Sequence, residues 1–441
     1  MISSRPRRKL AVAGSGDLSL SRIPWDGGPS YWTVAQEGSK MTKAEAAGWS
    51  DPSFFPICVF LAAPSEAATY GTMGINTYMT AQHNVPITTI TNEGLYVIAQ
   101  YPVTAPDGET DTGWSTAEIG SNGNVVGWFI YDEAEQGEGV YWDLFDNPNA
   151  GPSSTEFERL TFFQSETATR RALADGRFMF ANWGNGVMGS FWAPNTMDDF
   201  VQTVDASCVD KYAYTSPGVR GLFDDAPNWP SGANPRTSAA YGWFASELAN
   251  TYSDPGHRQP AWVFLETKMP LLNETDAEII LYAEIRGAVW SAIANEARGI
   301  AYFDHNGNYT GNPTDPNTGS APDEDSPALI NAEPALRTYV TTLNNQVLTL
   351  APVLNTQSYV FNFGATGIKT MLKAKDGFAY IFASVDIAGT TGSKTFTVTG
   401  SGITGTNVEV VDEARSLTIS GGSFSDTFAQ EYSHHIYKVA I

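Results

Sequence analysis

The sequence predicts an α/β protein in which a (β/α)8 TIM barrel precedes an all-β antiparallel sandwich domain. From about residue 54, short apolar runs alternate with polar segments and helix-like sequence. This pattern is typical of a parallel sheet that is buried on both faces. After about residue 355, apolar and polar residues alternate between Gly-rich turns, as in antiparallel sheets. Eight strand–helix alternations favour a closed barrel over a doubly wound sheet.

We therefore divide the chain into an N-terminal arm (1–52), a barrel (53–354) and a β-sandwich domain (355–441). The apolar runs predict eight barrel strands at 55–61, 75–79, 95–100, 125–131, 177–181, 211–214, 261–265 and 299–303. Helical periodicity predicts helices at 65–71, 156–174, 196–204, 236–251, 276–295 and 335–349. Strands of the sandwich are expected at 359–363, 370–374, 378–385, 394–399, 408–411, 416–419, 423–428 and 435–440.

The composition narrows the possible partners. Charged residues make up 17% of the chain, and the formal net charge is −23. A surface this acidic repels phosphate, so we expect neither nucleic acid nor anionic membrane as a partner. Neutral polysaccharides remain open. No apolar stretch is long enough for a membrane helix, and no glycine-rich nucleotide-binding motif follows a strand, so no cofactor is expected.

The two cysteines, Cys58 and Cys208, are too few for a disulfide framework, and we expect buried free thiols. The N-terminus starts with basic residues, but the apolar stretch that follows is too short for the core of a signal peptide. We therefore expect no cleavable signal.

Active sites of barrel enzymes lie at the carboxyl ends of the strands. The polar and aromatic residues that follow the predicted strands are therefore the candidate site residues. They are His83, Asp132, Glu133, Asn182, Trp183, Tyr214, Glu266, Asp304 and His305.

Two carboxylates are the strongest candidates, because each directly follows an apolar strand where an unpaired charge is costly to bury. Glu133 follows the fourth strand and Glu266 the seventh. The ends of these two strands face each other across the mouth of an eight-stranded ring. Two opposed carboxylates are the minimal machinery for glycoside hydrolysis. Either residue on its own is as readily explained as a structural ion-pair partner.

Two segments resemble the large clan of retaining (β/α)8 glycoside hydrolases. Residues 127–133 (GWFIYDE) are similar to the clan's strand-four motif, and residues 286–303 resemble its segment from helix seven to strand eight. The resemblance implies Glu133 as general acid/base and Glu266 as nucleophile, with carboxyl groups roughly 5–5.5 Å apart. Asp132 stands where well-known members of the clan have Asn, so the group that contacts the sugar 2-OH stays open. Asp132 is also the alternative candidate for the acid.

The remaining candidates would bind substrate or support the carboxylates. Trp183 would stack on a sugar ring, and Tyr214 would hydrogen-bond Glu266 and hold it ionised. His83, Asn182, Asp304 and His305 would contact the substrate. A calcium-loop spacing that begins at Asp304 lacks the glycine this motif requires, so no metal is expected.

A second resemblance concerns residues 13–32, 48–57 and 74–78, which look like minor tail proteins of phages that infect actinobacteria. It implies a virion (phage tail) or extracellular location, other tail proteins as partners, and a cell-envelope polysaccharide such as actinobacterial arabinogalactan as substrate. The alternatives are a non-catalytic glycan-binding protein and a structural tail protein on the same scaffold.

Overall fold

The computed structural model describes most of the chain. The described residues are 18–24, 27–33, 35–36, 39–83, 85–104, 110–136, 159–189, 193, 195–216, 219, 223, 226–255, 258–267, 278–304 and 334–441. Within these ranges, no helix combines the length and the apolar character that crossing a bilayer needs.

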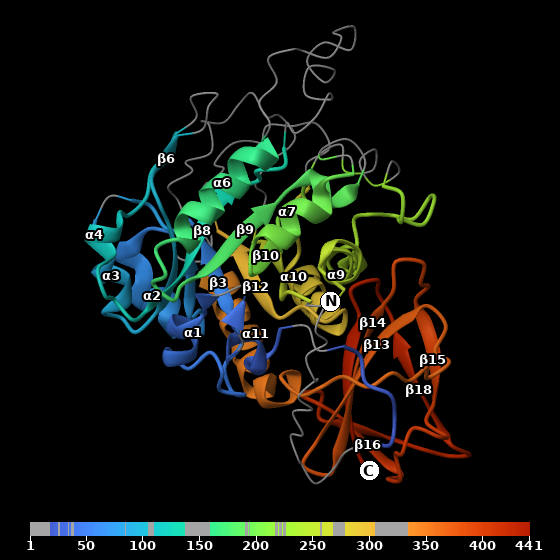
Figure 1. Ribbon diagram of the computed structural model, residues 1–441. Helices are drawn as coiled ribbons and strands as arrows, with labels where there is room; N and C mark the ends of the chain where they lie inside the picture. The colour runs from blue at the N-terminus through green and yellow to red at the C-terminus, as the bar shows by residue number, and fades with distance from the viewer. Residues whose placement is uncertain are drawn as a thin grey trace, which may run out of the picture.

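Eight parallel strands close into a barrel, as the sequence predicts (Figure 1). In barrel order they are β3 (Ile57–Phe60), β4 (Thr77–Met79), β5 (Tyr96–Gln100), β8 (Val125–Asp132), β9 (Phe178–Trp183), β10 (Ala206–Val209), β11 (Ala261–Glu266) and β12 (Gly299–Phe303). Seven of them overlap the predicted ranges. The sixth does not: it ends at Val209, before the predicted run at 211–214.

Helices cover the outside of the barrel (Figure 1). They are α2 (Ala67–Thr72), α3 (Thr88–Thr91), α4 (Thr116–Ile119), α6 (Arg159–Arg171), α7 (Met197–Thr203), α9 (Ser238–Glu247), α10 (Tyr282–Ala294) and α11 (Pro334–Leu354). The helix predicted from residue 276 begins only at Tyr282, where the Glu284 side chain accepts a hydrogen bond from the Leu281 backbone N–H at 2.7 Å.

The N-terminal arm closes the amino end of the barrel. Its short helices, η1 (Pro29–Thr33) and α1 (Thr42–Ala46), belong to the same apolar cluster as the interior residues of the strands. Trp49 packs against Phe178 and Trp262, with ring centroids 5.4 and 6.1 Å apart. Aromatic side chains thus fill the amino end of the barrel. A site that opens to solvent is therefore expected at the carboxyl ends of the strands.

The C-terminal part forms an antiparallel β-domain with two sheets, as predicted, but the strand expected at 359–363 is absent, and this segment makes only isolated bridges at Tyr359. One sheet has the order β13 (Ile368–Lys375), β14 (Phe378–Val385), β19 (His434–Ala440), β16 (Asn407–Val410) and β17 (Arg415–Thr418), and the other pairs β15 (Gly392–Thr397) with β18 (Ser423–Phe428). Phe396 and Phe424 stack within its core at 5.0 Å.

This domain packs on the side of the barrel that carries α9 and α10 (Figure 1). Trp290 of α10 stacks on Phe382 of β14 at 6.0 Å. The contact brings the loop between β18 and β19 next to the N-terminus of α9.

Candidate active site

The two predicted carboxylates lie at the carboxyl ends of the fourth and seventh strands of the barrel. Glu133 directly follows β8, and Glu266 is the last residue of β11. Glu266 lies two and four residues after Phe264 and Trp262 of β11, which belong to the apolar cluster inside the barrel. Successive side chains of a strand point to opposite faces, so Glu266 points into the barrel. Both carboxylates therefore lie at the rim where active sites of barrels form.

Glu266 is fully buried, and hydrogen bonds hold one of its two carboxylate oxygens. The Oε1 atom accepts from the backbone N–H of Tyr214 at 3.1 Å and from the hydroxyl of Tyr241. The Oε2 atom has no hydrogen-bond partner among the residues that the structure describes. Burial raises the pKa of Glu266 to about 7, although these donors favour the charged form. The carboxylate is thus fixed through one oxygen, while the other is buried and makes no hydrogen bond within the described part of the chain.

Glu133 has a strained backbone, with a φ angle of +49° that residues other than glycine seldom adopt. Its N–H still donates to the carbonyl oxygen of Asn182 at 3.0 Å, which continues the pairing of β8 with β9. Its carboxylate fills the space above Gly184, where a Cβ atom would lie 2.1 Å from the Glu133 Oε1 atom. A glycine at position 184 is therefore required for this placement of Glu133.

Asp210 lies beside Glu133, and the two carboxyl groups are hydrogen-bonded to each other. Burial is the main cause that raises the pKa of both groups, and the negative charge of Glu133 raises that of Asp210 further. The hydrogen bond with Asp210, followed by the charge of nearby Lys211, opposes the rise at Glu133. Two carboxylates this close do not both ionise readily, so the pair holds a proton well above the usual range of a carboxyl group.

A further carboxylate, Glu135, is fully buried behind Glu133. Its Oε1 atom accepts from the backbone N–H groups of Gly184 and Gly186 at 2.7 and 3.2 Å. Burial, followed by the charge of Glu133, raises the pKa of Glu135 to about 8. We assign it a structural role, because it ties the end of β8 to the turn η3 (Asn185–Met188) that follows β9.

Tyr212 marks the centre of this group. Its ring packs against Phe303 at the end of the eighth strand, with centroids 5.1 Å apart. Burial raises the pKa of its hydroxyl most, and the charges of four carboxylates then raise it further: Asp210, Glu133, Asp132 and Glu266. The fourth, sixth and seventh strands therefore bring their carboxylates around one tyrosine.

Asp132 and Asn182 are also brought into this group. They lie opposite each other in the β8–β9 pairing, and the Asn182 side-chain amide donates to Asp132 Oδ1 at 2.8 Å. Asn182 is fully buried, and its Oδ1 atom has no hydrogen-bond partner among the described residues. Asn182 thus links Asp132 to the interior of the site.

The structure corrects the expectations for Tyr214 and Trp183. The Tyr214 hydroxyl bonds Glu431 and Ser238 at 2.6 and 2.8 Å, and only its backbone N–H reaches Glu266. Trp183 is fully buried between Phe163 of α6 and Phe200 of α7. Alternation along β9 points its ring toward the helices, so neither face is available for a sugar.

Of the three other candidates, two make contacts outside the group around Tyr212 and one lies outside the described residues. His83 packs edge-to-face on Trp114, and its Nε2 atom lies 3.7 Å from Oε1 of Glu118 in α4. Asp304 is buried, and it accepts hydrogen bonds from Tyr70 at 2.5 Å and Thr267 at 3.3 Å, which anchors β12 rather than facing a substrate. His305 and most of the calcium-like segment lie outside the described residues.

The part of the chain with described side chains contains no cluster of three or more His, Cys, Asp or Glu residues arranged to hold a metal ion. Cys58 and Cys208 are both free and buried, as expected. The arrangement around Tyr212 is thus one of carboxyl groups, amides and tyrosines, which can transfer protons and provide a nucleophilic oxygen.

Comparisons with known proteins support the fold. No protein-family model and no curated protein matches the chain. Among solved structures, the chain is similar to AmyP, crystallised in complex with maltose, with a TM-score of 0.50 and 10% identity over 89% of this chain and 98% of AmyP. A protein described as a glycoside hydrolase gives a TM-score of 0.47 with 13% identity, over 88% and 92% of the two chains. A family 5 glycoside hydrolase from Bacteroides vulgatus gives 0.46 with 12% identity, over 88% and 89%. At 10% identity, the likeness to AmyP shows a shared fold alone.

Proposed function

We propose that the protein is a retaining glycoside hydrolase, with Glu133 as general acid/base and Glu266 as nucleophile. The observation that carries the proposal is the pair of carboxylates on the fourth and seventh strands, one protonated readily and the other fixed through a single oxygen. Glu266 Oε2 has no partner among the described residues, as a nucleophile requires. The proton held by Glu133 and Asp210 supplies the acid.

In the first step, Oε2 of Glu266 forms a bond to the anomeric carbon while the glycosidic bond breaks. Glu133 gives its proton to the departing oxygen, so the leaving group departs as an alcohol. In the second step, ionised Glu133 takes a proton from a water molecule whose oxygen attacks the same carbon and releases Glu266. Tyr241 and the Tyr214 N–H hold Glu266 in place during both steps.

The finer parts of the proposal rest on sequence resemblance. We propose a neutral cell-envelope polysaccharide, such as actinobacterial arabinogalactan, as the substrate, and the tail of a phage particle as the location. The net charge of −23 suits an uncharged polymer better than an anionic one. AmyP, which shares the fold, was crystallised with the sugar maltose, so starch is a reasonable second substrate to test.

The test is the release of reducing ends from purified mycobacterial arabinogalactan and from soluble starch. We expect the wild type to cleave one of them, and Glu266→Gln to lower turnover by more than about 10³-fold while glycan binding persists. Nuclear magnetic resonance of the first-formed product should show retention of the anomeric configuration. Initial inversion would refute the double displacement. Binding without any cleavage by the wild type would favour the non-catalytic alternative, and neither binding nor cleavage would favour a structural tail protein.

A further inference from the structure

The C-terminal β-domain contributes one carboxylate, Glu431, to the surroundings of the candidate active site. Glu431 lies in the loop between β18 and β19. Its Oε1 atom accepts from the Tyr214 hydroxyl at 2.6 Å, and its Oε2 atom accepts from the backbone N–H of Ser238 at 2.8 Å. The Tyr214 hydroxyl and the Ser238 hydroxyl are also hydrogen-bonded at 2.8 Å. A residue from one domain therefore binds two points of the other.

Both contacts of Glu431 are with segments that carry a hydrogen-bond donor to Glu266. Tyr214 is itself one donor, through its backbone N–H. Ser238 is the first residue of α9, one helical turn before Tyr241, whose hydroxyl is the other donor. The N-cap residue of α9, Thr237, makes no capping hydrogen bond through its side chain, so Glu431 satisfies an N–H that a helix leaves unpaired at its start. The rings of Tyr214 and Tyr241 also stack, with centroids 5.7 Å apart.

We propose that Glu431 is a positioning residue through which the C-terminal domain holds Tyr214 and α9, and thereby Glu266, in place. This inference rests on the proposed function, in which Glu266 is the nucleophile. It assigns the β-domain a part in the reaction, beside the barrel's own contacts to Tyr214 from Ser238 and Arg236. A small displacement of a reacting group is enough to lower a rate by about 10²-fold, so loss of this support should reduce the rate of bond cleavage more than substrate binding.

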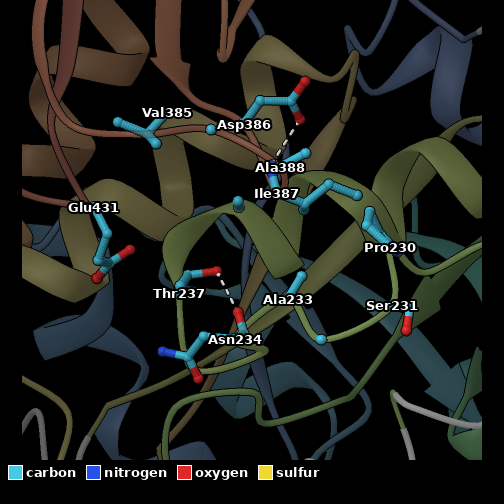
Figure 2. Close-up of a pocket in the computed structure, with 13 residues that line it drawn as sticks. Pro230, Ser231, Ala233, Asn234, Thr237, Val385, Asp386, Ile387, Ala388 and Glu431 are labelled. Carbon is cyan, nitrogen blue, oxygen red and sulfur yellow. Dashed lines mark hydrogen bonds between the residues drawn. The ribbon is translucent and has the colours of Figure 1, made fainter.

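Glu431 also borders a cavity of about 370 Å³ between the barrel and the β-domain. Figure 2 shows Glu431 at one side of this cavity, between Val385–Ala388 of the β-domain and Thr237 and Asn234 of the barrel. Among the described residues, Glu284 of α10 and Asp386 in the cavity wall are charged groups around Glu431, and Arg236 donates to the carbonyl oxygen of Tyr214. The cavity permits substitutions at position 431 without overpacking.

The first experiment compares Glu431→Ala with the wild type on whichever polysaccharide, arabinogalactan or starch, the wild type cleaves. We expect kcat to fall about 10- to 100-fold while KM changes less than about twofold. Glu431→Gln keeps an acceptor for one of the two donors, so its kcat should fall between those of Glu431→Ala and the wild type. Asp386→Ala is the matched control: it lines the same cavity, bonds only locally to the Ile387 N–H, and should keep wild-type kcat.

Two readouts separate positioning from a general loss of structure. In Glu431→Ala, the loosened donors stabilise the charged form of Glu266 less, so the acidic limb of the kcat/KM profile should move to higher pH. Combining Glu431→Ala with Tyr241→Phe should lower kcat by less than the product of the two single effects, because both act through Glu266.

Wild-type kcat and an unshifted acidic limb in Glu431→Ala would overturn the inference and leave the proposed function standing. If that variant does not fold, wild-type kcat in Glu431→Gln overturns it equally. A wild-type protein that cleaves neither polysaccharide instead refutes the proposed function, which makes the two failures distinguishable.

Discussion

At the scale of single residues, the acid of the proposed reaction is one half of a pair. Glu133 and Asp210 are hydrogen-bonded, and burial raises the pKa of both. Since their titrations are coupled, the pair loses its protons in two steps that belong to both groups. An enzyme with this arrangement keeps its acid protonated at a pH where an isolated glutamate would be ionised.

Replacing Asp210 with Asn tests the role of this pair. In the wild type, the hydrogen bond from Asp210 lowers the pKa of Glu133, whereas burial and the charge of Glu133 raise the pKa of Asp210, so Asp210 keeps its proton to higher pH. Asn keeps a donor beside Glu133 but carries no proton that titrates. The pair therefore loses its upper protonation step, and the basic limb of the kcat/KM profile should move to lower pH by about one unit or more. The acidic limb, which Glu266 governs, should stay in place. A basic limb that does not move would show that the proton on Asp210 does not govern this limb.

The sequence predicts that Glu133 and Glu266 lie at the ends of two barrel strands, where the structure has them, but it does not indicate Asp210 or Tyr241 beside them. Glu133 and Glu266 were predictable because each directly follows a long apolar run. Asp210 follows a strand that the pattern did not reveal, and Tyr241 lies inside an apolar helix, where nothing in the local sequence distinguishes it from a core tyrosine. Only tertiary packing shows that its hydroxyl reaches Glu266.

At the scale of elements, the sixth strand shows why the prediction failed. β10 consists of Ala, Ser, Cys and Val, whereas the residues after it are bulkier and resemble a strand more closely. Its interior residues are small because their neighbours are large: Ala206 pairs with Phe180, and Cys208 with Trp262. Small and large side chains alternate around the barrel to fill a fixed volume. Once β10 is placed, alternation from Cys208 directs Asp210 inward.

The connection between β8 and η3 gives a prediction about stability. Glu135 has a pKa of about 8 in the folded protein, above the ~4.3 of an unfolded chain. The folded state therefore binds a proton that the unfolded state has lost, and stability falls as pH rises between these values, by about 1.4 kcal/mol per unit at most. Glu135→Gln removes this dependence but keeps an oxygen that accepts from Gly184 and Gly186.

The melting temperature of Glu135→Gln relative to wild type should accordingly rise between pH 5 and pH 8 and level off above about pH 8. Thermal denaturation of both proteins across this range measures the difference. Glu296→Gln is a suitable contrast, because nearby Lys373 and Arg298 lower the pKa of Glu296 against the effect of burial. The melting temperature of Glu296→Gln relative to wild type should not rise between pH 5 and pH 8. A constant difference for Glu135→Gln would contradict a neutral, buried Glu135.

At the scale of the whole molecule, the two ends of the barrel have separate tasks. The four carboxylates around Tyr212 lie at the carboxyl ends of the strands, while the N-terminal arm fills the amino end with aromatic rings. In barrels of this kind, residues at the amino end contribute to stability and those at the carboxyl end to function. The β-domain differs from the arm because its loop reaches the surroundings of Glu266 through Glu431.

Trp49 allows this division to be tested. It is 1% exposed and contacts Trp32 of the arm, with centroids 4.9 Å apart, as well as Phe178 and Trp262 inside the barrel. Trp49→Ala should lower the free energy of unfolding by about 3–5 kcal/mol, since a large buried ring leaves a cavity behind. Trp49→Phe, which keeps one ring, should lower it by less.

In both variants kcat per folded molecule should stay at the wild-type value, because the cavity lies at the end of the barrel away from Glu133 and Glu266. Chemical denaturation measures the first effect, and activity corrected for the folded fraction measures the second. If kcat per folded molecule fell in these variants as well, the two ends of the barrel would be coupled.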